Sequence, residues 1–149
     1  VKLGLFYDDE LVSVMTFGVS RYNKNCQYEM HRFCNKLGYQ IIGGASKLFK
    51  YFLNNHNPKS ILTYPNRRYS DGTFYEKIGF TSIGYSKPSH WYFGKNIDGL
   101  ASRNQFQKHL LSDKLDDFNP ELTAWENMKL NGYDRIWDCG NYKFEWKRN

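Results

Sequence analysis

The sequence predicts an α+β fold whose sheet begins with antiparallel strands. Apolar runs at residues 3–7 and 11–17 flank the acidic segment Asp8-Asp9-Glu10, a pattern typical of a β-hairpin. A strand, a glycine-rich turn, a helix and a second strand follow in that order between residues 27 and 64. Short strands and short helices then alternate to the end of the chain.

The middle of the chain supplies the strand, helix and strand. A polar loop at residues 18–26 leads to an alternating strand at 27–34. Apolar residues then recur at helical spacing and predict a helix over 46–54 with one buried stripe. Asn57-Pro58 ends this helix, and a β-rich run follows at 60–64.

The second half is predicted to hold shorter elements. A helix at 73–78 ends at Gly79, strands follow at 81–85 and 91–93, and residues 103–111 have a helical pattern.

The last elements are predicted to be a helix and a hairpin. Asn119-Pro120 is expected to begin a helix that continues over 121–128, with the asparagine as its N-cap. Residues 133–139 and 142–146 are expected to pair across Gly140-Asn141.

Composition predicts one domain with a basic surface. The chain has 149 residues, of which 40% are apolar and 18% aromatic, and its mean hydropathy is −0.73. Much of the apolar area therefore comes from rings, which can stack on flat ligands when they are half-buried. The formal net charge of +6 suits a polyanionic partner, of which nucleic acid is the commonest. Simple solubility is the alternative explanation of the charge.

The cysteines and the apolar runs indicate an intracellular protein. Cys26, Cys34 and Cys139 are odd in number and include no Cys-x-x-Cys pair, which argues against a disulfide framework or a zinc site. No stretch approaches the ~20 apolar residues of a membrane span, and Val1 opens directly into sequence of folded character. We therefore expect a cytoplasmic protein with no metal and no membrane contact, and a fragment of a longer chain. The oligomeric state is not predicted.

A glycine-rich turn between the strand at 27–34 and the next helix is the candidate anion site. Glycine lets the backbone approach an anion closely, and the free amides at a helix N-terminus point toward it. A simple tight turn is the alternative. The residues of this turn are Gln40, Ile41, Ile42, Gly43, Gly44, Ala45, Ser46 and Lys47.

Two motifs resemble the GNAT acyltransferase superfamily over residues 3–93. In that family a Gln/Arg-x-x-Gly-x-Gly/Ala turn binds the pyrophosphate of coenzyme A, and residues 40–45 match each defined position. An aromatic-Tyr-x-x-x-Gly-Phe run follows in the family, and residues 74–80 match it. The resemblance implies a mixed, mostly antiparallel sheet splayed between the family's fourth and fifth strands, with helices on both faces. It also implies acetyl-CoA or a related acyl-CoA as the donor.

The chain also resembles two phage-associated groups. One is the C-terminal domain of phage homing endonucleases that carry a very-short-patch-repair-like nuclease domain. The other is the Mom family, which modifies adenine in phage DNA. The segments that match the endonuclease domain are 32–36, 43–52, 75–80, 106–109 and 133–141, and that domain is in turn similar to the Mom family. These resemblances imply a DNA partner and a phage-infected bacterial host. Where the Mom relatives read Tyr-Ala-Asp, this chain has Tyr64-Pro65-Asn66 and lacks the acid.

Acyl transfer of this kind needs a base for the amine and an acid for the departing thiolate. Glu29 is the candidate base, and on an alternating strand it shares a face with His31 and Phe33. Its alternative role is an ion pair with Arg32 or Lys36 on a solvated face. The resemblance makes Tyr75 the candidate acid, and the alternative is an aromatic ring that only packs the short helix.

Two further side chains of this strand carry possible chemistry. His31 has the proton-transfer range of a base, although a structural hydrogen-bonding role is the alternative. Cys34 is a possible nucleophile for an acyl-enzyme route, and a buried inert thiol is its alternative.

Two basic loops carry the predicted nucleic-acid contacts. In a GNAT arrangement they flank the mouth of the splayed strands, where basic side chains neutralise phosphates and rings stack an extruded base. A solvated basic surface is the alternative. The residues are Ser20, Arg21, Tyr22, Lys24, Arg32, Asn66, Arg67, Arg68 and Tyr69.

Three functions follow from these residues. The leading one is a GNAT-fold transferase that places an acyl-derived group on a DNA base amine. A catalytically silent DNA-binding module of a phage homing endonuclease is the second, and Asn66 favours it. An ordinary protein or small-molecule N-acyltransferase is the third.

Overall fold

The computed structural model describes residues 1–148 and divides into two compact units. Unit 1 comprises residues 1–86 and 141–149, and unit 2 comprises residues 87–140. Each unit has its own apolar cluster. The single domain expected from the composition stays a prediction, and the division into two compact units is a finding of the structure.

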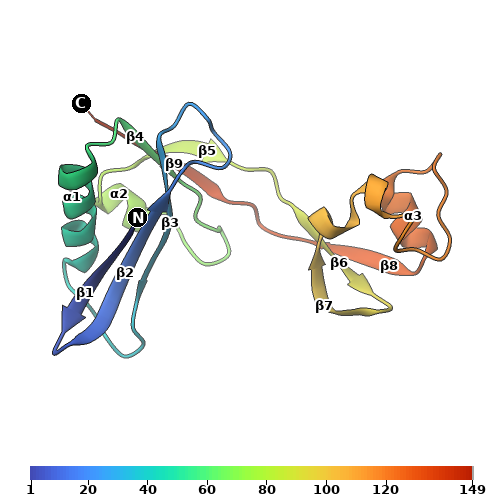
Figure 1. Ribbon diagram of the computed structural model, residues 1–149, viewed down its shortest axis with the longest axis horizontal. Helices are drawn as coiled ribbons and strands as arrows, with labels where there is room; N and C mark the ends of the chain where they lie inside the picture. The colour runs from blue at the N-terminus through green and yellow to red at the C-terminus, as the bar shows by residue number, and fades with distance from the viewer. Residues whose placement is uncertain (149) are drawn as a thin grey trace. The chain divides into compact units, whose positions relative to one another are not determined.

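Unit 1 is built on a six-stranded sheet in the order β1-β2-β3-β4-β9-β5 (Figure 1). The predicted first hairpin is confirmed, with Asp8 and Asp9 in the left-handed region that a two-residue turn requires. The strands are β1 (Lys2–Tyr7), β2 (Glu10–Gly18), β3 (Tyr28–Asn35), β4 (Ser60–Thr63), β5 (Thr81–Tyr85) and β9 (Tyr142–Lys147).

The sheet is splayed between β3 and β4, the third and fourth strands along this chain, where the resemblance implied a splay between the family's fourth and fifth strands. These strands run parallel and pair only at Tyr28 with Ile61 and at Glu29 with Leu62. Just past the last pair, the Thr63 hydroxyl donates to the carbonyl of Met30 at 3.0 Å. The Met30 carbonyl thus has a hydrogen-bond partner although it lies beyond the last paired residues. The two strands diverge after this point.

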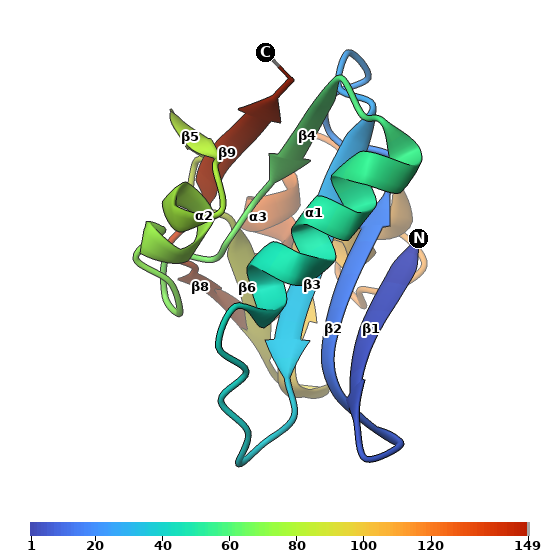
Figure 2. The same ribbon diagram turned by 90° about the vertical axis from the view of Figure 1, so that its left-hand side faces the viewer.

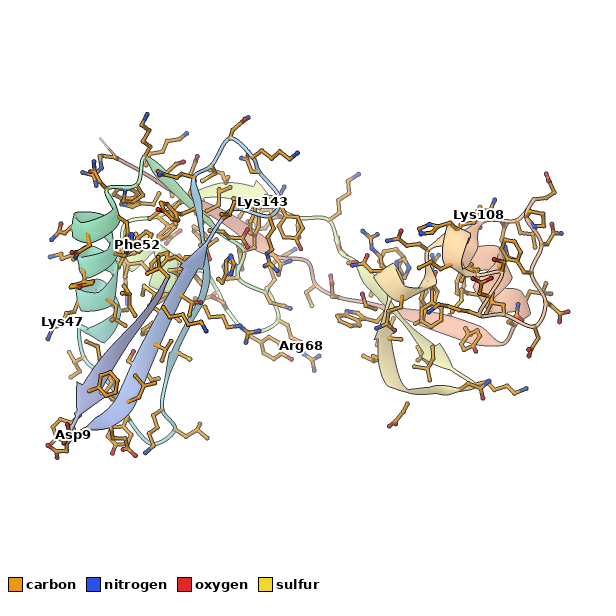
Figure 3. The ribbon with its side chains drawn as sticks, in the orientation of Figure 1. Asp9, Lys47, Phe52, Arg68, Lys108 and Lys143 are labelled. Carbon is orange, nitrogen blue, oxygen red and sulfur yellow. The ribbon has the colours of Figure 1, made fainter. Side chains whose placement is uncertain are left out.

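Helices α1 (Gly44–His56) and α2 (Thr73–Lys77) both contribute to one apolar cluster on one face of this sheet (Figure 2). The ring of Phe52 on α1 lies 3.6 Å from that of Phe17 on β2, centroid to centroid, and is fully buried. Figure 3 shows Phe52 pointing from α1 toward the sheet. Within unit 1 the helices therefore do not cover both faces as expected, because only turns and loops connect β1, β2 and β3.

Unit 2 is a three-stranded antiparallel sheet with short helices. Its strands β6 (His90–Gly94), β7 (Ile97–Ser102) and β8 (Tyr133–Trp137) are ordered β7-β6-β8. Two 3₁₀ helices, Arg103–Phe106 and Lys108–Leu110, and helix α3 (Ala124–Leu130) lie between β7 and β8 in the chain. The cluster that they bury comprises Tyr92, Leu111, Leu115 and Met128.

The predicted C-terminal hairpin is wrong. β8 pairs with β6 in unit 2, whereas β9 lies between β4 and β5 in unit 1. Phe144 on β9 is buried in the cluster of unit 1, so core packing and not sequence proximity selects its partners. Unit 2 is therefore inserted between two neighbouring strands of unit 1. Hydrogen bonds between Ser86 and Asn141 tie the two ends of that insertion together.

The helical predictions in unit 2 also need correction. Helix α3 begins after Thr123, whose side chain forms a reciprocal capping box with Glu126, and Asn119 only caps the turn before it. Residues 103–111 form two 3₁₀ helices because the extended backbone of Gln107 interrupts them. Strand β7 was not predicted.

Truncation of Phe52 tests the cluster of unit 1. Phe52→Ala should cost about 3–5 kcal/mol, because it leaves a cavity between α1 and the sheet. Leu37→Ala is the matched control, since Leu37 is 95% exposed. Urea unfolding followed by circular dichroism measures both variants. Equal stabilities of the two variants would contradict this packing.

Candidate functional site

A cleft of about 590 Å³ opens in unit 1 where β3 and β4 diverge. Strand β3, the end of β4, the loop before β3, the loop after β4 and helix α2 supply its walls. Among the described residues the lining contains two arginines and no carboxylate. The lining residues are Arg21, His31, Arg32, Phe33, Cys34, Thr63, Tyr64, Pro65, Asn66, Tyr69, Ser70 and Tyr75.

Tyr75 reaches the cleft from α2. Its ring stacks on Phe144 at 5.4 Å between centroids, which fixes its direction. Burial raises the pKa of Tyr75, and a hydrogen bond with the Thr63 side chain offsets part of that rise. The hydroxyl therefore keeps its proton at neutral pH, as a group that donates a proton must.

Glu29 is buried beneath the cleft and is not part of its lining. Its Oε2 accepts the backbone N–H of Arg21 at 3.1 Å, and its Oε1 accepts Nη2 of Arg21 at 3.1 Å. The alternative role predicted for Glu29, an ion pair with Arg32 or Lys36 on a solvated face, is wrong, because Glu29 is buried and pairs with Arg21. Lys36 pairs with Glu10 instead.

A bulge in β3 changes the faces that the sequence predicted. Thr16 pairs with Arg32 and Phe17 with Met30, so His31 has no direct partner on β2. The extra residue moves Phe33 to the apolar cluster, where its ring stacks on Phe74 of α2 at 5.1 Å. The prediction that Phe33 shares a face with Glu29 is therefore wrong.

Cys34 is exposed and lines the cleft. The interpretation of Cys34 as a buried thiol is therefore wrong. Cys26 is the buried thiol, and Cys139 in unit 2 is exposed.

The two basic loops contribute unequally to the cleft. Four of the nine predicted nucleic-acid residues line it: Arg21, Arg32, Asn66 and Tyr69. Tyr22 lies edge-on to the cleft residue Tyr64 at 5.6 Å. Lys24 and Arg68 are exposed on the same loops, and Figure 3 shows Arg68 pointing outward.

The other two residues, Ser20 and Arg67, have structural partners. Ser20 is buried, and its hydroxyl accepts the N–H of Asn23. The guanidinium of Arg67 lies over the ring of Tyr85 at 4.9 Å. Asn66 shapes its own loop, because its Oδ1 accepts the N–H of Arg68 at 2.8 Å.

Sequence reasoning missed Thr63 and Tyr64 as cleft residues. Both lie where β4 ends, and the signal that could have found them is the end of a strand that follows a crossover helix. Burial raises the pKa of Tyr64, and the neighbouring Glu29 charge adds to the rise.

The positive charge of the chain belongs to unit 1. Unit 1 has 14 Lys and Arg against 7 Asp and Glu, a balance of +7, whereas unit 2 has 7 against 8, a balance of −1. An anionic partner is therefore attracted to the unit that holds the cleft.

The glycine-rich turn begins α1 and lies outside the lining of the cleft. Gly43 is the N-cap with φ 73°, and a Cβ added there would meet nothing within 4 Å, so the surface over it is open. The amides of Ala45 and Ser46 precede the first helical bond, from the N–H of Lys47 to Gly43. The first turn holds no acidic residue, and Figure 3 shows Lys47 pointing away from the sheet.

Two further findings concern residues 1–148. No three His, Cys, Asp or Glu side chains among them are grouped so that they could hold a metal ion. None of the helices in that range has the length and apolar character needed to cross a membrane.

No protein-family model matches the chain, and no curated protein matches it significantly. Among solved structures it is similar to the PaiA N-acetyltransferase of Thermoplasma acidophilum in complex with coenzyme A. The TM-score is 0.50 and the identity 15%, over 99% of this chain and 60% of that one. The chain thus spans about 60% of that protein's length, and the likeness shows a GNAT-like fold. These comparisons do not support the links to phage endonucleases or to Mom.

Replacement of Tyr75 by phenylalanine should change how the free energy of unfolding depends on pH in the alkaline range. With a raised pKa in the folded protein, the unfolded chain loses the Tyr75 proton first, so stability falls as pH rises above about 10. Tyr75→Phe should cost about 0.5–1.5 kcal/mol at pH 8, and the deficit should shrink toward pH 11. Melting temperatures over this range measure it. Tyr51→Phe, at an exposed site on α1, should keep the wild-type pH dependence. A Tyr75→Phe deficit that stays constant with pH would count against this prediction.

Proposed function

We propose that this chain is a GNAT-fold transferase directed at nucleic acid, which moves an acyl group from an acyl-CoA to a base amine. The cleft between β3 and β4 carries the proposal. It combines a protonated tyrosine, two arginines and further aromatic rings, of which Tyr69 is exposed, and its described lining has no carboxylate. A phage or mobile-element setting, in the bacterial cytoplasm, is part of the proposal through the resemblances of the sequence.

The glycine-rich turn fits the diphosphate of the donor. The open surface over Gly43, the free amides of Ala45 and Ser46 and the missing acid in the first turn all favour an anion there. Residues 40–47 would hold the diphosphate, with Lys47 as an added point charge. The structural neighbour was solved with coenzyme A, which supports the same donor for this fold. When bound, the donor supplies the acyl thioester.

The acceptor is argued from the charge and the rings of the cleft. An amine on a polycation would need carboxylates near it, and the described lining offers Arg21 and Arg32 instead. Guanidinium groups bind phosphates, and a ring such as Tyr69, which is 78% exposed, can stack on a base. An amine carried by an anionic, flat molecule fits both features, and a nucleobase within a nucleic acid is such an amine.

The chemistry that this cleft would support is a direct transfer. The amine nitrogen forms a bond to the acyl carbon, the carbon–sulfur bond breaks, and the amine loses one proton. Tyr75 donates its hydroxyl proton to the departing sulfur and regains one from solvent. The arginines hold phosphates and place the base beside Tyr75.

A binding module without catalysis is the second candidate. Asn66 stands where the Mom relatives have an acid, and its Oδ1 accepts the N–H of Arg68 and shapes the loop, which favours binding without catalysis. A third candidate, acylation of a protein or a small molecule, would leave the basic balance of unit 1 without a role.

Acetyl transfer to DNA tests the proposal. Purified protein with acetyl-CoA and mixed-sequence single-stranded or duplex DNA should yield an acetylated nucleoside by mass spectrometry. Tyr75→Phe should lower the rate about 10²-fold or more, because the thiolate loses its acid. Tyr51→Phe is the matched control, at an exposed site on α1. No adduct from the wild type, at DNA concentrations that saturate binding, would leave the binding module as the function.

Donor binding is checked in the same preparation. Acetyl-CoA should slow the alkylation of Cys34, which lines the cleft, and leave Cys139 unchanged. Equal alkylation of Cys34 with and without acetyl-CoA would contradict donor binding in this cleft.

Charge reversal on the two loops tests the nucleic-acid partner. Lys24→Glu with Arg68→Glu should weaken binding to single-stranded DNA about tenfold or more and reduce the salt slope by about 2, one for each phosphate contact. Lys108→Glu with Lys129→Glu in unit 2 is the matched control. Fluorescence anisotropy at several salt concentrations measures both. Equal losses in the two double variants would rule out the loops as the contact surface.

A further inference from the structure

We infer that His31 is the general base of the proposed transfer, and that Glu29 positions it. The inference rests on the proposed function and names the group that receives the amine proton. Both residues lie on β3, but they differ in access to the cleft. His31 lines the cleft, whereas Glu29 lies buried beneath it.

The bulge in β3 is the first reason for this assignment. His31 is the extra residue of β3, so its position is not fixed by a partner on β2, and bulges of this kind redirect a side chain. The resulting ring lies over Gly18 of β2. A Cβ at residue 18 would be 2.9 Å from Cε1 of His31, so glycine leaves the space that the ring occupies.

The position of Glu29 is the second reason. Its Oε1 lies 4.0 Å from Nε2 of His31, and the carboxylate side chain is only 3% exposed, whereas the imidazole is 32% exposed. Arg21 engages both carboxylate oxygens, through its backbone N–H and its guanidinium. A substrate amine in the cleft therefore meets the imidazole, and the carboxylate behind it stabilises the imidazolium that forms.

The step balances with residues already in place. As the amine nitrogen bonds to the acyl carbon, the amine proton passes to Nδ1 of His31, because Nε2 is the ring nitrogen that faces Glu29. The carbon–sulfur bond breaks, and the sulfur takes the hydroxyl proton of Tyr75. Exchange with water then returns the proton from His31 and restores Tyr75, so the net products are the amide and the free thiol.

Imidazole rescue tests the base directly. His31→Ala should lower kcat for acetyl transfer to single-stranded DNA about 10²-fold or more and leave the KM for acetyl-CoA within about twofold. Because the alanine leaves space above Gly18, added imidazole should restore part of the rate. His109→Gln, at an exposed site in unit 2, is the matched control. Transfer that survives in His31→Ala, or a loss that imidazole does not reverse in a folded variant, would overturn the inference.

Two positioning variants extend the test. Gly18→Ala pushes against the ring and should lower kcat with acetyl-CoA binding unchanged. Glu29→Gln should lower kcat about tenfold and add nothing to His31→Ala, because residues that act as a unit are not additive. Additive losses in the double variant would overturn the positioning role of Glu29.

Histidine modification separates failure of this inference from failure of the proposed function. Carbethoxylation of His31 should slow when acetyl-CoA and single-stranded DNA are bound, and that of His109 should not. Unprotected His31 in an enzyme that transfers acetyl groups would overturn the base alone. No transfer by the wild type to any DNA would overturn the proposed function, and the base with it.

Discussion

The short parallel contact between β3 and β4 is the constraint on which the rest of unit 1 depends. Two residue pairs join the strands. Where the ladder would otherwise continue, the Thr63 hydroxyl donates a hydrogen bond to the carbonyl of Met30. Buried backbone groups need partners, and this side chain provides one without extending the sheet. The strands can then separate, and their separation makes the cleft.

Packing on both sides keeps that separation open. On the edge of β4 that faces away from β3, strand β9 pairs with all four residues of β4 and holds that strand in its place in the sheet. Phe52 of α1 and Phe74 of α2 pack in the same apolar cluster, and Tyr75 is directed by its stack on Phe144 of β9. The position of the proposed acid therefore depends on a strand that comes 67 residues later in the chain.

The two units differ in net charge as well as in their cores. Unit 2 is inserted between β5 and β9, carries a slightly negative balance and has its own core, whereas the positive balance and the cleft belong to unit 1. Within unit 1, the hydrogen bonds from Arg21 to the buried carboxylate of Glu29 hold the first basic loop against β3. Burial of a carboxylate without partners costs free energy of folding, so Arg21 stabilises the fold by donating to Glu29. This structural role is independent of any role in chemistry.

The sequence by itself determined the local elements of unit 1 and the identity of its motifs. Hairpin β1–β2, the Gly43 turn, α1 and the Tyr75 helix all rest on nearby residues, such as two turn aspartates or a glycine with positive φ, and short-range patterns encode them. Tertiary structure alone decided the partner of β9, the bulge at His31, the pairing of Glu29 with Arg21 and the division into two units. Those features depend on which distant side chains fill one core and satisfy one buried charge, and no local pattern in a single sequence carries that information.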